Sequence, residues 1–215
     1  MFKKIILTLT GLILSFNIQA ENINNIKPNI DYIEETTKQT LVSSEKPVFV
    51  DFFWYGCGHC YSMKPQVKQL VKKHEKNIVS KSYPATFENW KSGSQIFFTL
   101  ESLNRIDSMH DKIFDEIHLN KKNILKNENL LLQTIKSYGI NEKDFQSVYS
   151  SFSTQSKVSK AMQITKELNI ESTPYFVIYY KGKTYKTSPG MTGSYEKTIA
   201  TLDYLLSNFT RNTKK

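Results

Sequence analysis

Residues 48–60 read VFVDFFWYGCGHC, and this stretch decides the fold. Its first part, residues 48–54, is too uniformly apolar for a half-exposed strand and predicts a strand buried on both faces. Cys57 and Cys60 follow, at the start of a helix-like stretch over residues 61–73. A strand that leads two cysteines to a helix N-terminus places the first where free N–H groups and the helix dipole stabilise a thiolate. This arrangement indicates redox chemistry.

The chain of 215 residues has no other cysteine. A secreted fold that relies on disulfides for stability normally shows several pairs. A disulfide across two intervening residues closes almost no chain and contributes little to stability. The pair is therefore expected to be oxidised and reduced in turn. A carrier of copper or zinc that uses Cys57, Cys60 and His59 is an alternative, but no further ligands are spaced with these residues, so we expect no metal.

The N-terminus has the pattern of an export signal. Lys3 and Lys4 precede an apolar core over residues 5–16, and Ala20 ends the segment. The core is too short to span a bilayer in the mature protein, so we predict a signal peptide over residues 1–20 rather than a retained membrane anchor.

The chain is basic, but its sequence does not indicate nucleic-acid binding. Removing the signal takes away two lysines and no acidic residue, which lowers the formal charge from +9 to +7. No basic helix with interleaved aromatic residues is present, and an exported protein does not meet chromosomal DNA. We therefore expect a solvated, lysine-rich surface and no nucleic-acid partner.

The remaining pattern separates strands from helices. Residues 78–83, 175–180 and 183–186 predict strands, the last two joined as a hairpin at Lys181-Gly182. Ser194 is the expected N-cap of a final helix. Between residues 87 and 169, apolar residues recur at helical spacing in successive stretches, at 96–103, 109–117, 130–135, 145–152 and 158–168. Gly139 is predicted to end one of these helices, Asn141 to begin the next, and His74, His110 and His118 to lie on helix surfaces.

Together these residues resemble the thioredoxin superfamily. The resemblance rests on Trp54, the Cys57-Gly58-His59-Cys60 motif, Pro65, and Thr173-Pro174 directly before a strand. In that superfamily the proline is cis and lies beside the two cysteines. The interval from Cys60 to Pro174 is 114 residues, much longer than in thioredoxin itself, and helical patterns fill it. A helical insertion at this point is typical of the DsbA family of periplasmic thiol oxidases, which the stretches FFWYG and Pro189-Gly190-Met191 also resemble.

The resemblance implies an α/β protein, a thioredoxin fold with an inserted helical subdomain. Its first part is expected over residues 21–86 and carries the two cysteines. The helical insertion is expected over residues 87–169. The second part, over residues 170–215, carries Thr173-Pro174.

The resemblance also assigns roles at the site. Cys57 is the expected nucleophile, exposed at the helix N-terminus, and Cys60 the shielded resolving cysteine. His59 is expected to add a positive charge or a hydrogen bond close to the sulfur. Thr173 and Pro174 are expected to bind substrate, and Met191 either lines the substrate groove or belongs to the core.

Three further residues are expected to tune the redox potential. Gly58 stands where well-studied family members have proline, so the dipeptide between the cysteines is Gly-His. Asp51 falls where the family often has a buried acid. Lys81 falls on the next strand, where a partner lysine can occur, and the two are predicted either to tune the site or to form a purely structural pair.

The function implied is that of a periplasmic thiol:disulfide oxidoreductase that donates its disulfide to exported proteins. An isomerase or reductase is the alternative, but residues 21–44 are too short for the dimerisation region of known periplasmic isomerases, so we expect a monomer. The resemblance further implies re-oxidation by a DsbB-like, quinone-linked membrane protein, and no cofactor of the chain's own.

Overall fold

The computed structural model describes residues 25–36, 41 and 44–211. The predicted signal peptide, residues 1–20, lies outside these ranges. None of the helices within them is long and apolar enough to cross a membrane.

A five-stranded sheet forms the centre of the molecule, in the order β1-β5-β4-β2-β3. The strands are β1 (Ile33–Thr36), β2 (Val48–Phe53), β3 (Val79–Pro84), β4 (Tyr175–Tyr180) and β5 (Lys183–Thr187). β2 and β3 run parallel, and the other neighbouring pairs are antiparallel. β2 and β4 lie in the middle because their residues are apolar on both faces and every residue of β4 is buried.

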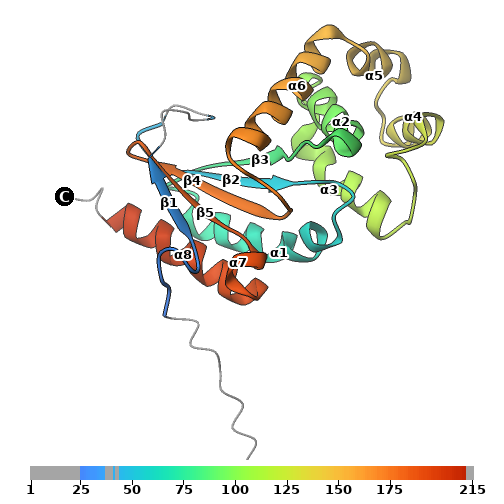
Figure 1. Ribbon diagram of the computed structural model, residues 1–215. Helices are drawn as coiled ribbons and strands as arrows, with labels where there is room; N and C mark the ends of the chain where they lie inside the picture. The colour runs from blue at the N-terminus through green and yellow to red at the C-terminus, as the bar shows by residue number, and fades with distance from the viewer. Residues whose placement is uncertain (1–24, 37–40, 42–43, 212–215) are drawn as a thin grey trace, which may run out of the picture.

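Helices cover the sheet on both sides (Figure 1). α1 (Gly58–His74) and α8 (Tyr195–Arg211) pack on one face, and the short α7 (Pro189–Thr192) precedes α8. The C-terminal part of α6 covers the other face, where Ile164 and Leu168 contact the side chains of β2 and β4.

The helical subdomain lies between β3 and β4 in the chain and beside the end of β2 in space (Figure 1). After a short 3-10 turn at Glu88–Trp90 it contains α2 (Lys91–Ser102), α3 (Ile106–His118), α4 (Glu128–Ser137), α5 (Glu142–Tyr149) and α6 (Phe152–Glu167). Its hydrophobic core continues through Phe53 and Tyr55 to the two cysteines. The cysteines therefore lie where the subdomain and the sheet meet.

The predicted thioredoxin fold with an inserted helical subdomain is confirmed, and so are the four predicted strands to within a few residues. β1 and α7 were not predicted, because each is only four residues long and shows little periodicity. The domain limits at residues 86 and 169 remain a prediction.

The predicted helix ends agree with the structure. Oδ1 of Asn141 accepts from the N–H groups of Lys143 and Asp144, and Gly139 adopts φ +75° after α4. Oγ of Ser194 accepts from the N–H of Lys197 at 3.1 Å, so Ser194 caps α8.

The prediction of surface histidines is wrong. His74 is 5% exposed, and its Nε2 lies 2.7 Å from Oδ1 of Asp203 on α8. His110 and His118 lie on α3 and pack against aromatic rings around Tyr55. Neighbouring elements cover α1 and α3, the two helices that carry these residues, on more than one side. The apolar spacing within a single helix does not reveal such neighbours.

Candidate active site

Cys57 is the N-cap residue of α1. Its backbone is extended, with φ −85° and ψ 111°, and its N–H donates to the carbonyl of Trp54 at 2.9 Å. Its Sγ accepts from the N–H of Cys60 at 3.2 Å. A sulfur in this position takes the place of the capping oxygen at a helix N-terminus, where the unpaired N–H groups favour negative charge.

These contacts lower the pKa of Cys57 from 9.0 to about 6. The largest cause is a hydrogen bond from the thiol of Cys60, which burial opposes. The hydroxyl of Thr173 and the N–H groups of Cys60 and His59 lower the pKa further. Cys57 is therefore mostly thiolate at neutral pH.

Cys60 has the opposite character. Burial raises its pKa well above the usual range, and the hydrogen bond to Cys57 and the negative charges of Cys57 and Asp51 raise it further. Both cysteines are free thiols in the structure. Cys60 thus keeps its proton while Cys57 carries the charge, as expected for a resolving cysteine beside a nucleophile.

The expectation that Cys57 is exposed is wrong. Cys57 is 8% exposed and Cys60 6%, because the subdomain and the Thr173-Pro174 loop close over the helix N-terminus. Ionisation, rather than exposure, therefore distinguishes the two cysteines.

The Thr173-Pro174 loop lies against Cys57, 116 residues away in the chain. The peptide bond between the two residues is cis, as the resemblance implies, and the carbonyl of Thr173 accepts a hydrogen bond from the Cys57 thiol at 3.3 Å. Pro174 is buried, and β4 begins at the next residue. The loop thus lies within hydrogen-bonding reach of the sulfur. Met191, on α7, is half-buried.

His59 and Gly58 form the outer surface of the motif. Both are exposed, and Nδ1 of His59 lies 2.5 Å from the hydroxyl of Tyr195, at the start of α8. The contribution of His59 to the low pKa of Cys57 comes from its backbone N–H. A Cβ at Gly58 would meet open space, so packing does not require glycine there.

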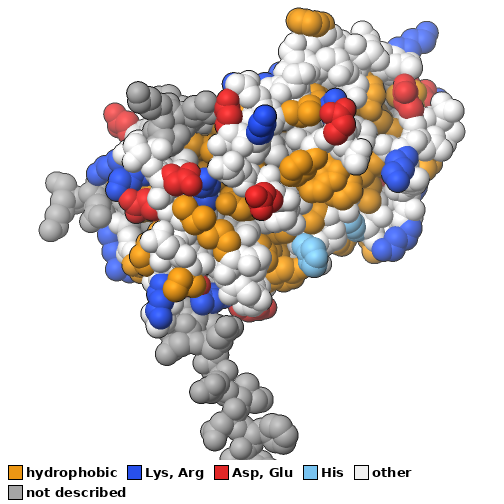
Figure 2. Space-filling view, in the orientation of Figure 1, with side chains coloured by type: hydrophobic (Ala, Val, Ile, Leu, Met, Phe, Trp, Pro, Cys, Tyr) orange, Lys and Arg blue, Asp and Glu red, His pale blue; other side chains and the backbone are white. Residues whose placement is uncertain are grey.

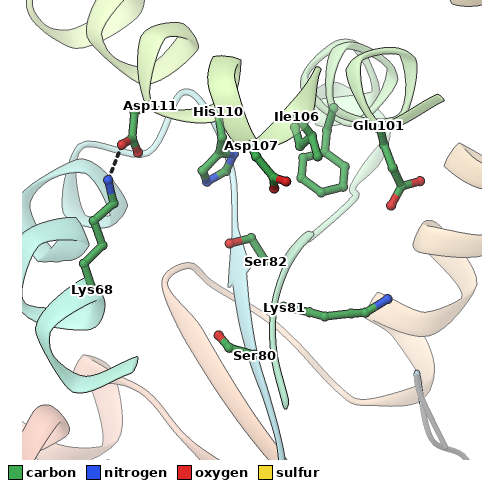
Figure 3. Close-up of a pocket in the computed structure, with 10 residues that line it drawn as sticks. Lys68, Ser80, Lys81, Ser82, Glu101, Ile106, Asp107, His110 and Asp111 are labelled. Carbon is green, nitrogen blue, oxygen red and sulfur yellow. Dashed lines mark hydrogen bonds and ion pairs between the residues drawn. The ribbon is translucent and has the colours of Figure 1, made fainter. Parts of the chain in front are cut away.

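The structure does not bring Asp51 and Lys81 together. Val50 is the register partner of Lys81 and Asp51 that of Ser82, and alternate residues of a strand point to opposite faces. Asp51 therefore faces α1, whereas Lys81 is exposed on the other face. Figure 3 shows Lys81 pointing away from Ser80 and Ser82. The predicted pairing, in either its tuning or its structural form, is wrong.

A cleft runs along β3 on the α3 side. One part, of about 460 Å³, is lined by Ser82, His110 and Asp111, and Figure 3 shows Asp111 paired with Lys68 across it. A second part, of about 420 Å³, reaches Asp51. Asp51 therefore combines a half-buried carboxyl with a route to the surface.

Burial, and secondarily the charge of Cys57, raises the pKa of Asp51 from 3.8 to about 7. The charged carboxylate therefore destabilises the folded state, a penalty that is absent below pH 4, grows as the pH rises and is complete above pH 7. We expect the reduced Asp51→Asn protein to be more stable than wild type by roughly 2–3 kcal/mol at pH 8, a value that allows for water in the cleft. At pH 4 we expect the two proteins to be equally stable.

The measurement is the free energy of unfolding by urea across this pH range. Asp107→Asn, which changes an exposed carboxylate on α3, is the matched control and should show no such rise. Equal stabilities of the Asp51→Asn and wild-type proteins at pH 8 would contradict the raised pKa.

Aromatic residues anchor the loop before the cysteines through contacts that no local sequence pattern predicts. The hydroxyl of Tyr55 lies 3.0 Å from Nδ1 of His110, and the carbonyl of Tyr55 lies 2.8 Å from Nε2 of His118. Trp54 stacks on Trp90 of the helical subdomain with ring centroids 4.5 Å apart. A Cβ at Gly56 would lie 2.5 Å from the Trp54 ring, so glycine is required by this close approach.

Apolar side chains gather in patches on one face of the molecule. Figure 2 shows apolar side chains gathered across the middle of this face, where the sheet meets the helical subdomain, with histidine side chains along their lower edge. Leu119, which directly follows α3, is 68% exposed. Such a surface next to a reactive sulfur is suited to contact with another polypeptide.

A thioredoxin fold with one low-pKa cysteine at a helix N-terminus and one shielded thiol defines a thiol:disulfide oxidoreductase. The family model of thioredoxin matches residues 29–87. The chain is 31% identical over 197 residues, 90% of each chain, to the thiol:disulfide interchange protein DsbA of Azotobacter vinelandii. It is 34% identical over 158 residues to DsbA of Burkholderia cepacia, covering 73% of each chain.

A solved structure agrees with these relatives. The crystal structure of Pseudomonas aeruginosa DsbA superposes with a TM-score of 0.76 at 27% identity, covering 88% of this chain and 97% of that one. The chain belongs to the DsbA family of thiol:disulfide interchange proteins. It is a thiol:disulfide oxidoreductase.

Proposed function

We propose that this protein works as an oxidase, which passes a disulfide between Cys57 and Cys60 to exported proteins in the periplasm. The observation that carries the proposal is the pKa of Cys57, lowered to about 6. A stabilised thiolate favours the reduced form of the pair, so the disulfide is readily reduced and oxidises other thiols. The signal-like residues 1–20 support export.

The reaction consists of two exchanges. A substrate thiolate attacks Sγ of Cys57, the bond between Cys57 and Cys60 breaks, and the sulfur of Cys60 leaves and takes up a proton. The raised pKa of Cys60 favours that proton uptake, and Asp51, with a pKa of about 7, is a suitable donor at the end of the cleft. The second substrate thiolate then attacks the substrate sulfur and releases Cys57 as a thiolate. The substrate dithiol is oxidised and the protein disulfide is reduced.

The geometry supports a protein substrate. The Thr173 backbone beside Cys57 can pair with an extended peptide, with Pro174 holding the loop, and the apolar patches in Figure 2 can contact apolar side chains. We propose unfolded exported proteins as substrates, a monomer as the working form, and a DsbB-like, quinone-linked membrane protein as the re-oxidising partner.

The redox potential of the Cys57–Cys60 pair in glutathione buffers tests the oxidising direction. We expect a value less negative than about −200 mV, on the oxidising side of the range for this superfamily, because each tenfold stabilisation of the reduced form adds about 30 mV. A value near about −270 mV, as in thioredoxin, would instead indicate a reductase. Reactivation of a scrambled disulfide protein without added oxidant would favour the isomerase alternative.

A further inference from the structure

The imidazole of His59 is bound to a residue far away in the sequence. Its Nδ1 lies 2.5 Å from the hydroxyl of Tyr195, 136 positions later, and the two rings meet edge to face with centroids 6.1 Å apart. This contact joins the first turn of α1, which carries the two cysteines, to the first turn of α8. His59 belongs to the redox motif, but its side chain has no other role in the exchange reaction described above.

Tyr195 occupies a well-supported position. It follows the capping residue Ser194, whose carbonyl accepts from the hydroxyl of Thr198 at 2.7 Å. The hydroxyls of Thr192 and Thr198 lie 2.6 Å apart, which ties α7 to α8. The tyrosine therefore presents its hydroxyl to His59 from a held helix end rather than from a free loop.

The sulfur of Cys57 has other partners. Besides the hydrogen bond from the Cys60 thiol, it contacts the N–H of Cys60 at 3.2 Å and the carbonyl of Thr173 at 3.3 Å. An imidazole nitrogen has either one proton or one lone pair to share. While Nδ1 of His59 is bonded to Tyr195, that atom cannot also donate to the sulfur.

We propose that Tyr195 is a positioning residue: its hydroxyl holds Nδ1 of His59 toward α8, away from the sulfur of Cys57, and thereby limits how strongly the site oxidises. The inference rests on the proposed function as an oxidase. In the released state, the ring N–H of His59, two residues from the thiolate, is free to donate to it, because the first turn of α1 brings both side chains to the same helix end.

The test is the Tyr195→Phe variant, which keeps the ring and removes the hydroxyl. We expect the pKa of Cys57, read from the ultraviolet absorbance of the thiolate, to fall by about half a unit to one unit, a roughly 3- to 10-fold gain in thiolate over thiol. The equilibrium with glutathione should move by the same factor toward the reduced protein, at most about 30 mV.

Two controls separate positioning from a structural effect. Tyr204→Phe removes the hydroxyl of another tyrosine on α8, 44% exposed, and should leave both readings unchanged. In a His59→Ala background, Tyr195→Phe should have no effect, because the histidine through which it acts is gone.

An unchanged or raised pKa of Cys57 in Tyr195→Phe would overturn the proposal, and so would an equal fall in the His59→Ala background. These readings use the protein without substrate. A failure of the proposed oxidase function would appear instead in the wild type, as a strongly reducing potential, whatever the Tyr195 variant shows.

Discussion

The Cys57→Ser variant is expected to lose thiol–disulfide exchange entirely, with a fall in rate on the order of a thousandfold or more, to the uncatalysed level. The physical reason is that a single sulfur performs both the capture and the release of substrate. Cys60 cannot replace it, because burial raises its pKa and leaves it protonated near neutral pH. The measurement is the rate at which oxidised protein converts a reduced dithiol peptide to its disulfide.

Cys60→Ser is the matched variant. It keeps the Cys57 thiol but removes the resolving cysteine. Its Cys57 thiolate should attack a disulfide-bonded peptide, release one peptide thiolate and leave a mixed disulfide that a non-reducing gel detects and that Cys60 can no longer resolve. Residual catalysis in Cys57→Ser, or trapped complexes formed through Cys60 rather than Cys57, would show that the roles are reversed.

The second large effect concerns the alkylation of the reduced protein in mild acid. With a pKa of about 6, Cys57 is about 9% thiolate at pH 5, whereas a thiol with a pKa of 9.0 is about 0.01% thiolate, a roughly 900-fold difference. A less basic thiolate is also a weaker nucleophile, by roughly 20-fold over three pKa units. We therefore expect Cys57 to react about 40 times faster than an ordinary cysteine peptide at pH 5. Burial of the sulfur lowers this ratio of rates.

The pH profile gives the sharper reading. The alkylation rate of wild type should rise with a midpoint near pH 6 and then level off, and mass spectrometry should find the label on Cys57. Cys57→Ser serves as the control and should remain unlabelled over the same range, because Cys60 keeps its proton. A midpoint near pH 9, or preferential labelling of Cys60, would contradict the assignment.

Much of the site could be predicted from local sequence. Cys57 lies at a helix N-terminus because a buried strand ends just before it and a helix pattern begins just after it. The stabilisation of its thiolate follows from that local geometry, since it depends on N–H groups within the same turn. The cis bond before Pro174 and its place beside Cys57 followed from resemblance, because no local pattern links positions so far apart.

The errors arose where a second element decides the environment of a side chain. Asp51 and Lys81 lie on neighbouring strands, but the register of β2 and β3 puts them on opposite faces of the sheet. Cys57 is less exposed than expected because the subdomain and the loop close over it. His74 and His110 belong to helices that neighbours cover, so their polarity did not predict exposure.

By itself, the sequence determined the order of all but the shortest strands and helices and the place of Cys57 at a helix N-terminus, because periodicity, caps and a helix N-terminus act over a few residues. Only the tertiary structure decided which side chains surround that sulfur. Tyr195 reaches His59, Thr173 reaches Cys57, and His118 reaches the Tyr55 carbonyl across 63 or more positions of the chain. Such contacts depend on strand register and helix packing, which are set by burial of the whole core and not by any one segment.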